Sequence, residues 1–440
     1  MLPAFSSLAH AAPAADLVDQ VPGFAKAPFK VYSGYLTVPG PFVQSPYASL
    51  HIHYEFHESQ RSPSSDPLVT WHQGGPGGSS LYGQYGEMGY FQVDSNGTHT
   101  NPVAWNRVAN MLYLESPAGS DDPIGFSYCS KDASGTPALA CSWNDTSQAE
   151  AYAHTLEAFY DAFPAYSSHP LYLTGESYAG QYVPNIANFI VQQLPSDGSR
   201  SVPVGLVEGP TPRAAANLKG FAVGNACWGG SENEVNCNGP NSEQNDIDMY
   251  FGKGLVAKPL YEEVYKTCEF PKISIKCDAL LAEASAQVGP HNVYDIYDNC
   301  PNTNEWLRRS GKTMRYLLKA LRAPMSTRGV NTNTAEEGGA APSKSMQQTR
   351  SDLLALSGGY DWSCDGLDAM ATFFRRDDVQ KAMHLGKPGR SRFEYRSSGP
   401  ASITLYPSLV KKLRILIYNG DSDRYEQYKL LRFVHLSHLP

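Results

Sequence analysis

A serine flanked by small residues stands where a predicted strand meets a predicted helix. Residues 171–174 form an apolar run typical of a buried strand, and residues 181–193 have helical spacing. Between them, Ser177 follows Gly175 by two residues and precedes Ala179 by two. Small residues at these places permit a sharp turn that projects the hydroxyl clear of the sheet. The placement predicts that Ser177 is a nucleophile, although the same five residues in an ordinary loop would have no chemical role.

A glycine-rich segment follows another short strand, which is expected at residues 67–71. Residues 74–78 consist of four glycines and one proline, which exclude helix and sheet and leave backbone N–H groups free to point at an anion. A phosphate-binding loop would continue with Gly-Lys-Ser or Gly-Lys-Thr, and no such sequence follows. The segment therefore predicts donors for the oxyanion of a tetrahedral intermediate.

Predicted strands and helices alternate along much of the chain. Further strands are expected at residues 30–38, 49–57, 111–114, 218–223 and 413–418, and helices at 148–163 and 377–385. This alternation indicates an α/β fold with a mostly parallel sheet and helices on both faces. We assign residues 28–225 and 357–423 to this core.

The pattern changes between residues 226 and 356. Helices are expected at 244–252, 259–267 and 278–287, among most of the remaining cysteines, as in a cap inserted into a larger domain. Residues 326–350 are rich in Thr, Asn, Gly, Ala and Ser without periodicity, which predicts a flexible loop.

The composition excludes several classes of protein. The chain has 440 residues, of which 41% are hydrophobic and 18% charged, and its formal net charge is −8. These values are typical of a globular protein, and the acidic balance argues against nucleic-acid binding. No run of about 18 apolar residues occurs, so no membrane span is expected.

The eight cysteines and two glycosylation sequons, at Asn96 and Asn144, favour an oxidising compartment. None of the cysteines forms a Cys-x-x-Cys pair, which argues against a zinc site or a redox dithiol. We expect disulfides between the closely spaced pairs Cys129–Cys141 and Cys268–Cys277, and eight free thiols are the alternative. The Ala-rich residues 1–15 have Ala-x-Ala-like ends but no basic start, as in a clipped secretion signal.

Three histidines, His51, His53 and His57, occupy every second position of the strand expected at 49–57, apart from Glu55. A metal site is one interpretation of this spacing. Because side chains alternate between the two faces of a strand, we instead expect these histidines on a solvent-exposed face.

Taken together, these residues resemble the serine carboxypeptidases, which are α/β-hydrolase-fold exopeptidases of the lysosome, vacuole or secretory route. The similar segments occur in family order at residues 71–80, 87–89, 112–119, 125–128, 175–180 and 419–423, and span roughly residues 31–423. The resemblance implies release of C-terminal amino acids from peptides or proteins through an acyl-enzyme on Ser177, with no cofactor. It also implies secretion or delivery to a vacuole or lysosome.

The resemblance assigns roles to further residues. It implies that the backbone N–H groups of Gly75 and Tyr178 form the oxyanion hole and that Asp423 is the acid of the catalytic triad. The acid would hold the tautomer of a histidine and stabilise its charged form. The neighbouring Asp421 is the alternative, although we expect it to be a turn residue.

The resemblance also implies that Gln73, Gly74, Glu87 and Glu176 bind the C-terminal carboxylate of the substrate. Asn holds the position of Gln73 in the family pattern. Two glutamates can bind a substrate carboxylate if they share one proton, because the ionisation of both is unfavourable when two carboxyl groups lie close together. The protonated carboxyl would donate a hydrogen bond to the substrate. We therefore expect an acidic optimum for peptide hydrolysis.

Besides Gln73, the chain departs from the family pattern in two further places. Gly78 replaces a Cys, and residues 424–440 do not match the strand, helix and Gly-His motif that carry the triad histidine in the family. His435 follows Asp423 by 12 residues, whereas a crossover needs about 10–12 residues plus a strand of about five. We expect neither His435 nor His438 to serve, so turnover by this sequence should be lower by orders of magnitude.

Two other classes of function remain open. An acyltransferase on the same scaffold would use a sugar ester and an alcohol that outcompetes water. A binding protein without catalysis is consistent with the unmatched segment 424–440.

Overall fold

The computed structural model describes residues 12–40, 46–94, 96–119, 124–192, 213–229, 241–289, 294–296, 366–386 and 391–423. The loop expected at 326–350, the segment 424–440 and most of residues 1–15 lie outside these ranges.

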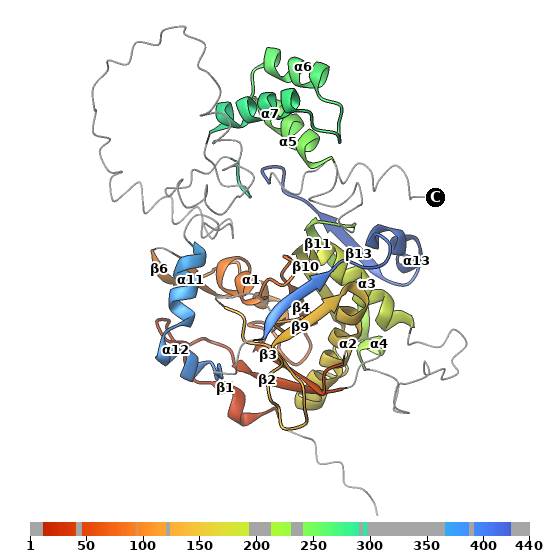
Figure 1. Ribbon diagram of the computed structural model, residues 1–440. Helices are drawn as coiled ribbons and strands as arrows, with labels where there is room; N and C mark the ends of the chain where they lie inside the picture. The colour runs from red at the N-terminus through yellow and green to blue at the C-terminus, as the bar shows by residue number, and fades with distance from the viewer. Residues whose placement is uncertain are drawn as a thin grey trace, which may run out of the picture.

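A nine-stranded sheet forms the centre of the structure (Figure 1). Its order is β1-β2-β3-β7-β4-β10-β11-β13, with β8 paired to β3. The strands are β1 (Leu17–Val18), β2 (Val31–Pro39), β3 (Ser49–His57), β4 (Leu68–His72), β7 (Asn110–Leu114), β8 (Tyr128–Ser130), β10 (Leu171–Ser177), β11 (Leu218–Ala226) and β13 (Arg414–Tyr418). The five adjacent strands β7, β4, β10, β11 and β13 are parallel to one another, and the other pairs are antiparallel. The predicted mostly parallel sheet is confirmed.

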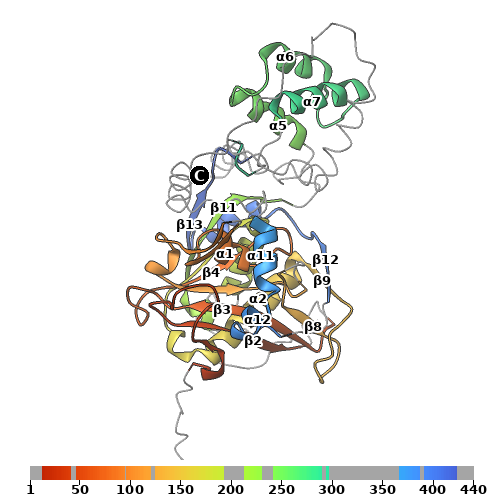
Figure 2. The same ribbon diagram turned by 90° about the vertical axis from the view of Figure 1, so that its left-hand side faces the viewer.

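Helices lie on both sides of this sheet (Figures 1 and 2). One side carries α2 (Asp145–Ala162), α3 (Ala179–Gln192), α4 (Arg213–Asn217) and α13 (Tyr406–Leu409), whose buried residues form the largest core with the strands. The other carries α1 (Leu81–Gly86), α11 (Gly366–Phe374) and α12 (Asp377–Ala382), around a second core. Helix α2 begins with a capping box. The Asn144 side chain accepts a hydrogen bond from the backbone N–H of Ser147, and the Ser147 hydroxyl accepts one from the backbone N–H of Asn144.

Shorter elements complete the domain. The hairpin of β5 (Phe91–Asp94) and β6 (Gly97–Thr100) packs near α11, and β9 (Ala140–Asn144) pairs in parallel with β12 (Arg392–Arg396). The 3₁₀ helices are η1 (Ala14–Asp16), η2 (Trp105–Arg107), η3 (Pro164–Tyr166) and η5 (Ser402–Leu405).

The helices expected after residue 226 form a separate cluster that stands away from the sheet in both views (Figures 1 and 2). They are α5 (Ser242–Gly252), α6 (Lys258–Thr267) and α7 (Ile275–Val288), and they bury their own apolar side chains. Both expected disulfides are present: Cys268–Cys277 joins α6 to α7, and Cys129–Cys141 joins β8 to β9. Across the described part of the chain, none of the helices is long and apolar enough to cross a membrane.

The expectation of a solvent-exposed histidine face on β3 is wrong. His53 and His57 are fully buried, and the half-buried ring of His51 stacks on Tyr128 with its centroid 4.4 Å away. The cause is that β3 lies inside the sheet, between β2 and β7, with side chains packed on both faces. Buried carboxylates partner the two buried imidazoles: Glu115 lies 3.1 Å from His53 and Glu55 lies 3.2 Å from His57.

Candidate active site

Ser177 is the last residue of β10, and only Tyr178 separates it from the start of α3 at Ala179. Its φ angle is +59°, a strained value for a residue with a side chain, and such strain is typical of a nucleophile held on a tight strand-to-helix turn. The turn needs a glycine at 175, because a Cβ there would lie 2.5 Å from the carbonyl oxygen of His72 and 2.7 Å from the Cβ of Ala179. The structure therefore places the Ser177 hydroxyl at the carboxyl end of the parallel strands, half-buried.

The glycine-rich segment lies directly against this turn. A Cβ added to Gly74 would lie 2.5 Å from the Cβ of Ser177, 2.8 Å from its Oγ and 2.6 Å from the backbone N of Tyr178. Within the segment, the N–H of Gly78 donates to the carbonyl of Gly74 and the N–H of Gly77 donates to the Tyr182 hydroxyl.

Two backbone donors beside Ser177 are free to bind an anion. Among the residues that the structure describes, neither the N–H of Gly75 nor that of Tyr178 has a hydrogen-bond partner. These are the two donors that the resemblance implies for an oxyanion hole, and they lie on the two segments that meet at Gly74.

Replacing Gly74 with alanine should therefore slow reaction at Ser177. The added methyl group cannot be accommodated unless the loop moves away from the turn, and a shift of about 1 Å can cost about 100-fold in rate. The rate of covalent modification of Ser177 by a fluorophosphonate measures the effect. Gly252→Ala is the matched control, because a Cβ there meets nothing within 4 Å. An unchanged rate in Gly74→Ala would show that the two segments do not act together.

The side chains of Gln73, Glu87 and Glu176 converge beside the nucleophile. Trp71 donates from its indole N–H to Gln73 Oε1 at 2.9 Å, and since indole is only a donor, this contact fixes the orientation of the amide. Gln73 Nε2 then donates to Glu176 at 2.6 Å and to Glu87 at 3.3 Å. Both amide hydrogens of Gln73 are thus directed at the two carboxylates, and both glutamates remain half-buried and open to a ligand.

The surroundings of the two glutamates raise the pKa of both carboxyl groups. Burial, the charge of Glu176 and a hydrogen bond to Glu176 raise the pKa of Glu87 well above its ordinary value. Burial also raises the pKa of Glu176, while its hydrogen bonds to Glu87 and Gln73 oppose that rise. A raised pKa favours the protonated form, and a protonated carboxyl group of this pair can present a hydrogen-bond donor to a carboxylate ligand.

Asp423 lies in a turn that follows β13, next to the carboxyl end of β11. It is 7% exposed, and its Oδ2 accepts from Asn225 Nδ2 at 2.8 Å. Asn225 also accepts from the N–H of Gly420 at 2.9 Å and has a φ angle of +40°, so it fixes the turn from both ends. Asp421 is exposed and pairs with Lys253 of the helical cluster at 3.0 Å. These environments favour Asp423 over Asp421 as the acid.

Sequence reasoning assigned no role to Asn225. The available signal was that Asn225 lies at the end of one predicted strand and that acidic residues follow another, at 413–418. The pairing of β11 with β13, which places the two ends side by side, was not known from the sequence.

The structure shows no histidine bonded to Ser177 within the described residues. His72 is close in sequence, but its Nδ1 donates to the carbonyl of Thr174 at 2.9 Å and its ring packs on Tyr152, with centroids 4.2 Å apart. Burial lowers the pKa of His72 to about 4. His72 therefore packs in the core and is not available to Ser177.

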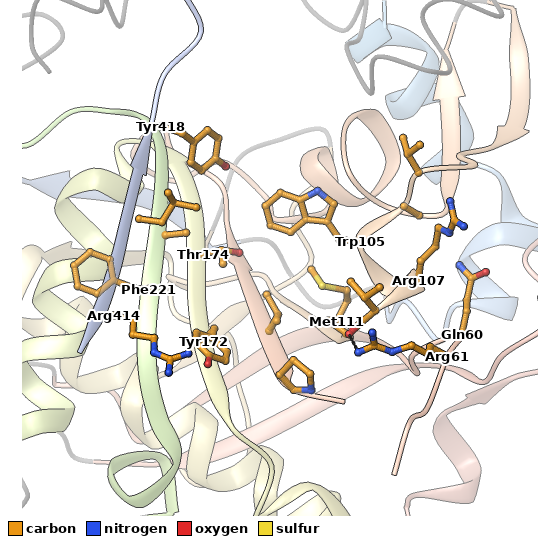
Figure 3. Close-up of a pocket in the computed structure, with 18 of the residues that line it drawn as sticks. Gln60, Arg61, Trp105, Arg107, Met111, Tyr172, Thr174, Phe221, Arg414 and Tyr418 are labelled. Carbon is orange, nitrogen blue, oxygen red and sulfur yellow. Dashed lines mark hydrogen bonds between the residues drawn. The ribbon is translucent and has the colours of Figure 1, made fainter. Parts of the chain in front are cut away.

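A groove of about 1280 Å³ lies along the sheet and is lined by residues of β4, β7, β10, β11 and β13 (Figure 3). Trp105, Met111, Tyr172 and Tyr418 line it, and none of the expected site residues does. Leu416 at its edge is 59% exposed, so no described residue covers the face there. Trp105 packs edge-on against Trp71, with ring centroids 5.5 Å apart, and separates the groove from Gln73. This groove therefore lies apart from the expected site residues.

Comparison with known proteins identifies the family. The sequence model of the serine carboxypeptidases matches residues 22–431, and the chain belongs to this family. It is 31% identical to the lysosomal protective protein of Mus musculus, in an alignment that covers 96% of this chain and 81% of that protein. It is 30% identical to serine carboxypeptidase-like 21 of Arabidopsis thaliana, covering 95% of this chain and 81% of that protein.

A solved structure supports the fold. The prohormone-processing carboxypeptidase Kex1(delta)p from Saccharomyces cerevisiae aligns with a TM-score of 0.55 and 20% sequence identity, covering 96% of this chain and 80% of that chain. The predicted α/β-hydrolase fold is thereby confirmed. No group of three or more His, Cys, Asp or Glu residues in the described part of the chain could hold a metal ion.

Proposed function

We propose that this protein is a serine-type carboxypeptidase in which Ser177 attacks the last peptide bond of a peptide. One observation carries the proposal: a strained serine turn touches a glycine segment, and two unpartnered backbone donors flank the hydroxyl. In the acylation step, Oγ loses its proton and bonds to the carbonyl carbon, and the backbone N–H groups of Gly75 and Tyr178 hold the resulting oxyanion. The peptide C–N bond then breaks, and the C-terminal amino acid leaves with the proton that came from Ser177. Water then releases the acyl group from Ser177.

The glutamate pair gives the proposed enzyme its preference for a free C-terminus. Glu87 donates its proton to the substrate carboxylate, and the backbone N–H of Gly74 supplies a second donor. Gln73 was expected to bind the substrate carboxylate, and because its amide donates to both glutamates it also holds the pair together. The extra methylene of Gln relative to Asn provides the reach for this bridge.

The reaction also requires a base for the Ser177 proton. Asp423 is placed by Asn225 to orient a histidine, but the described histidines bond elsewhere. We propose that the protein binds peptide C-termini at this site and hydrolyses the last peptide bond. A binding protein without turnover is the second candidate, favoured by the lack of a bonded histidine at Ser177 among the described residues.

The proposed compartment is the secretory pathway. Two disulfides between closely spaced cysteines are typical of proteins that fold in an oxidising environment, and the related protective protein is named as lysosomal. Secretion and delivery to a lysosome or vacuole are both consistent with these observations.

Calorimetry with an N-acyl-Phe-Leu dipeptide and its C-terminal amide tests the proposal. At pH 5 the free carboxylate should bind about 10–100-fold more tightly than the amide, because hydrogen bonds to a charged group contribute about 1.5–3 kcal/mol. Release of leucine, followed by mass spectrometry, measures turnover, and a sugar ester as acyl donor tests for an acyltransferase. Equal affinities for the carboxylate and the amide would contradict the proposed carboxylate site.

A further inference from the structure

Two fully buried pairs of glutamate and histidine lie beneath the glycine segment. Glu55 and His57 belong to β3, and their side chains are in contact at 3.2 Å. His53, also on β3, lies 3.1 Å from Glu115, which directly follows β7. All four side chains are 0% exposed. Burying an ionisable group costs free energy unless hydrogen bonds compensate. The other hydrogen-bond partners of these two glutamates therefore indicate which segments the glutamates hold in place.

Glu115 holds the end of the glycine segment. Its Oε1 accepts from the hydroxyl of Ser79, the residue that follows the last glycine, and its Oε2 accepts from the N–H of Phe126 at 3.0 Å. The Ser79 Oγ in turn accepts from the N–H of Leu81 at 3.2 Å, at the first residue of α1. Glu115 therefore fixes the point where the glycine segment becomes helix.

Glu55 holds the other end of α1. The Tyr85 hydroxyl lies 3.2 Å from both oxygens of Glu55, and Gln84 Nε2 lies 3.4 Å from His57 Nδ1. Both Gln84 and Tyr85 are fully buried in the last turn of α1, directly before Glu87.

Helix α1 packs tightly between these pairs and the glutamate site. A Cβ added to Gly83 would lie 2.2 Å from Trp71 Nε1, the indole atom that donates to Gln73. The Gly83 carbonyl accepts from the N–H of Glu87 at 3.2 Å. A shift of α1 would therefore move Gln73 and Glu87 relative to each other.

We propose that Glu55 and Glu115 are positioning residues for the binding of the substrate carboxylate. Neither touches the substrate. They act by anchoring the two ends of α1, so that Gln73 and Glu87 stay within hydrogen-bond distance of each other. This inference rests on the proposed role of Glu87 and Glu176 in binding a C-terminal carboxylate. The histidines His53 and His57 are the buried partners that allow these carboxylates to lie in the core.

The Glu55→Gln variant tests this role through ligand selectivity. The substitution preserves the shape of the side chain but removes one acceptor oxygen from a carboxylate that accepts hydrogen bonds from both Tyr85 and His57. We expect the affinity ratio between N-acyl-Phe-Leu and its amide to fall by about tenfold, since small displacements of positioned groups have large effects. The affinity for the amide should change less than about twofold. A general loss of folded protein would lower both affinities equally.

Two further variants keep the test decisive. Tyr85→Phe removes only the hydroxyl that bonds to Glu55, and it should lower the ratio in the same direction even if Glu55→Gln does not fold. Asp66→Asn is the matched control: this carboxylate is 4% exposed and bonds to Ser59 and Arg61, away from α1. It should lower the melting temperature without changing the ratio.

The outcomes separate this inference from the proposed function. A wild-type protein that prefers the carboxylate, with an unchanged ratio in Glu55→Gln and Tyr85→Phe, would overturn the positioning role alone. A wild-type protein without preference would overturn both. A ratio that falls in these two variants and stays constant in Asp66→Asn supports the positioning role.

Discussion

The Ser177→Ala variant should lose covalent modification by a fluorophosphonate, by a factor of at least about 1000, while it retains peptide binding. Alanine supplies no oxygen to bond to phosphorus, whereas the carboxylate site consists of other side chains. Mass spectrometry of the intact protein measures the adduct, and calorimetry with N-acyl-Phe-Leu measures binding. We expect the dissociation constant to stay within about threefold of wild type, because the small hydroxyl is not a carboxylate ligand.

Ser408→Ala is the control for this substitution. Ser408 is exposed in α13 and donates only to the carbonyl of Leu405, so both measurements should match the wild type. Continued labelling of the Ser177→Ala protein at wild-type rate would place the reactive group elsewhere and refute the assignment.

The affinity for a peptide carboxylate should fall as pH rises, by about tenfold for each pH unit above the raised pKa of Glu87. Below that pKa, Glu87 carries the proton that it donates to the ligand. As pH rises through it, the proton is lost, and a second negative charge then faces the ligand beside Glu176. Because burial and the charge of Glu176 raise the pKa of Glu87, this loss occurs at higher pH than for an ordinary carboxyl group.

Calorimetry between pH 5 and pH 8 measures this dependence, with the C-terminal amide as a control ligand that carries no charge at that end. Glu87→Gln should flatten the profile, since an amide donates a hydrogen bond at every pH. A steep profile that persists in Glu87→Gln would assign the titration to another group. A flat wild-type profile would show that the two glutamates do not share a proton in the way proposed.

Sequence reasoning predicted the parts of the molecule in which local chemistry and tertiary structure agree. The apolar runs that became β4, β7, β10 and β11 are fully or largely buried strands, and the turn at Ser177 and the glycine segment lie in contact as the motif required. The two disulfides were predicted because the cysteines of each pair are closely spaced in the sequence, and both are present.

The histidines of β3 show that the residue pattern of a single strand does not predict burial. Alternation predicts which side chains share a face, but not whether that face is covered. His53 and His57 are buried because α1 and its neighbours pack over them. Their carboxylate partners are Glu115, which directly follows β7, and Glu55 of β3 itself. Likewise, the bridge from Gln73 to Glu87 depends on the position of α1, which no local pattern specifies.

A crystal structure of the fluorophosphonate-treated protein tests the central claim most directly. It should show phosphorus bonded to Ser177 Oγ, with a phosphoryl oxygen within hydrogen-bond distance of the backbone N–H groups of Gly75 and Tyr178. An adduct on a different residue, or a phosphoryl oxygen directed away from both N–H groups, would contradict the assignment of this turn as the active site.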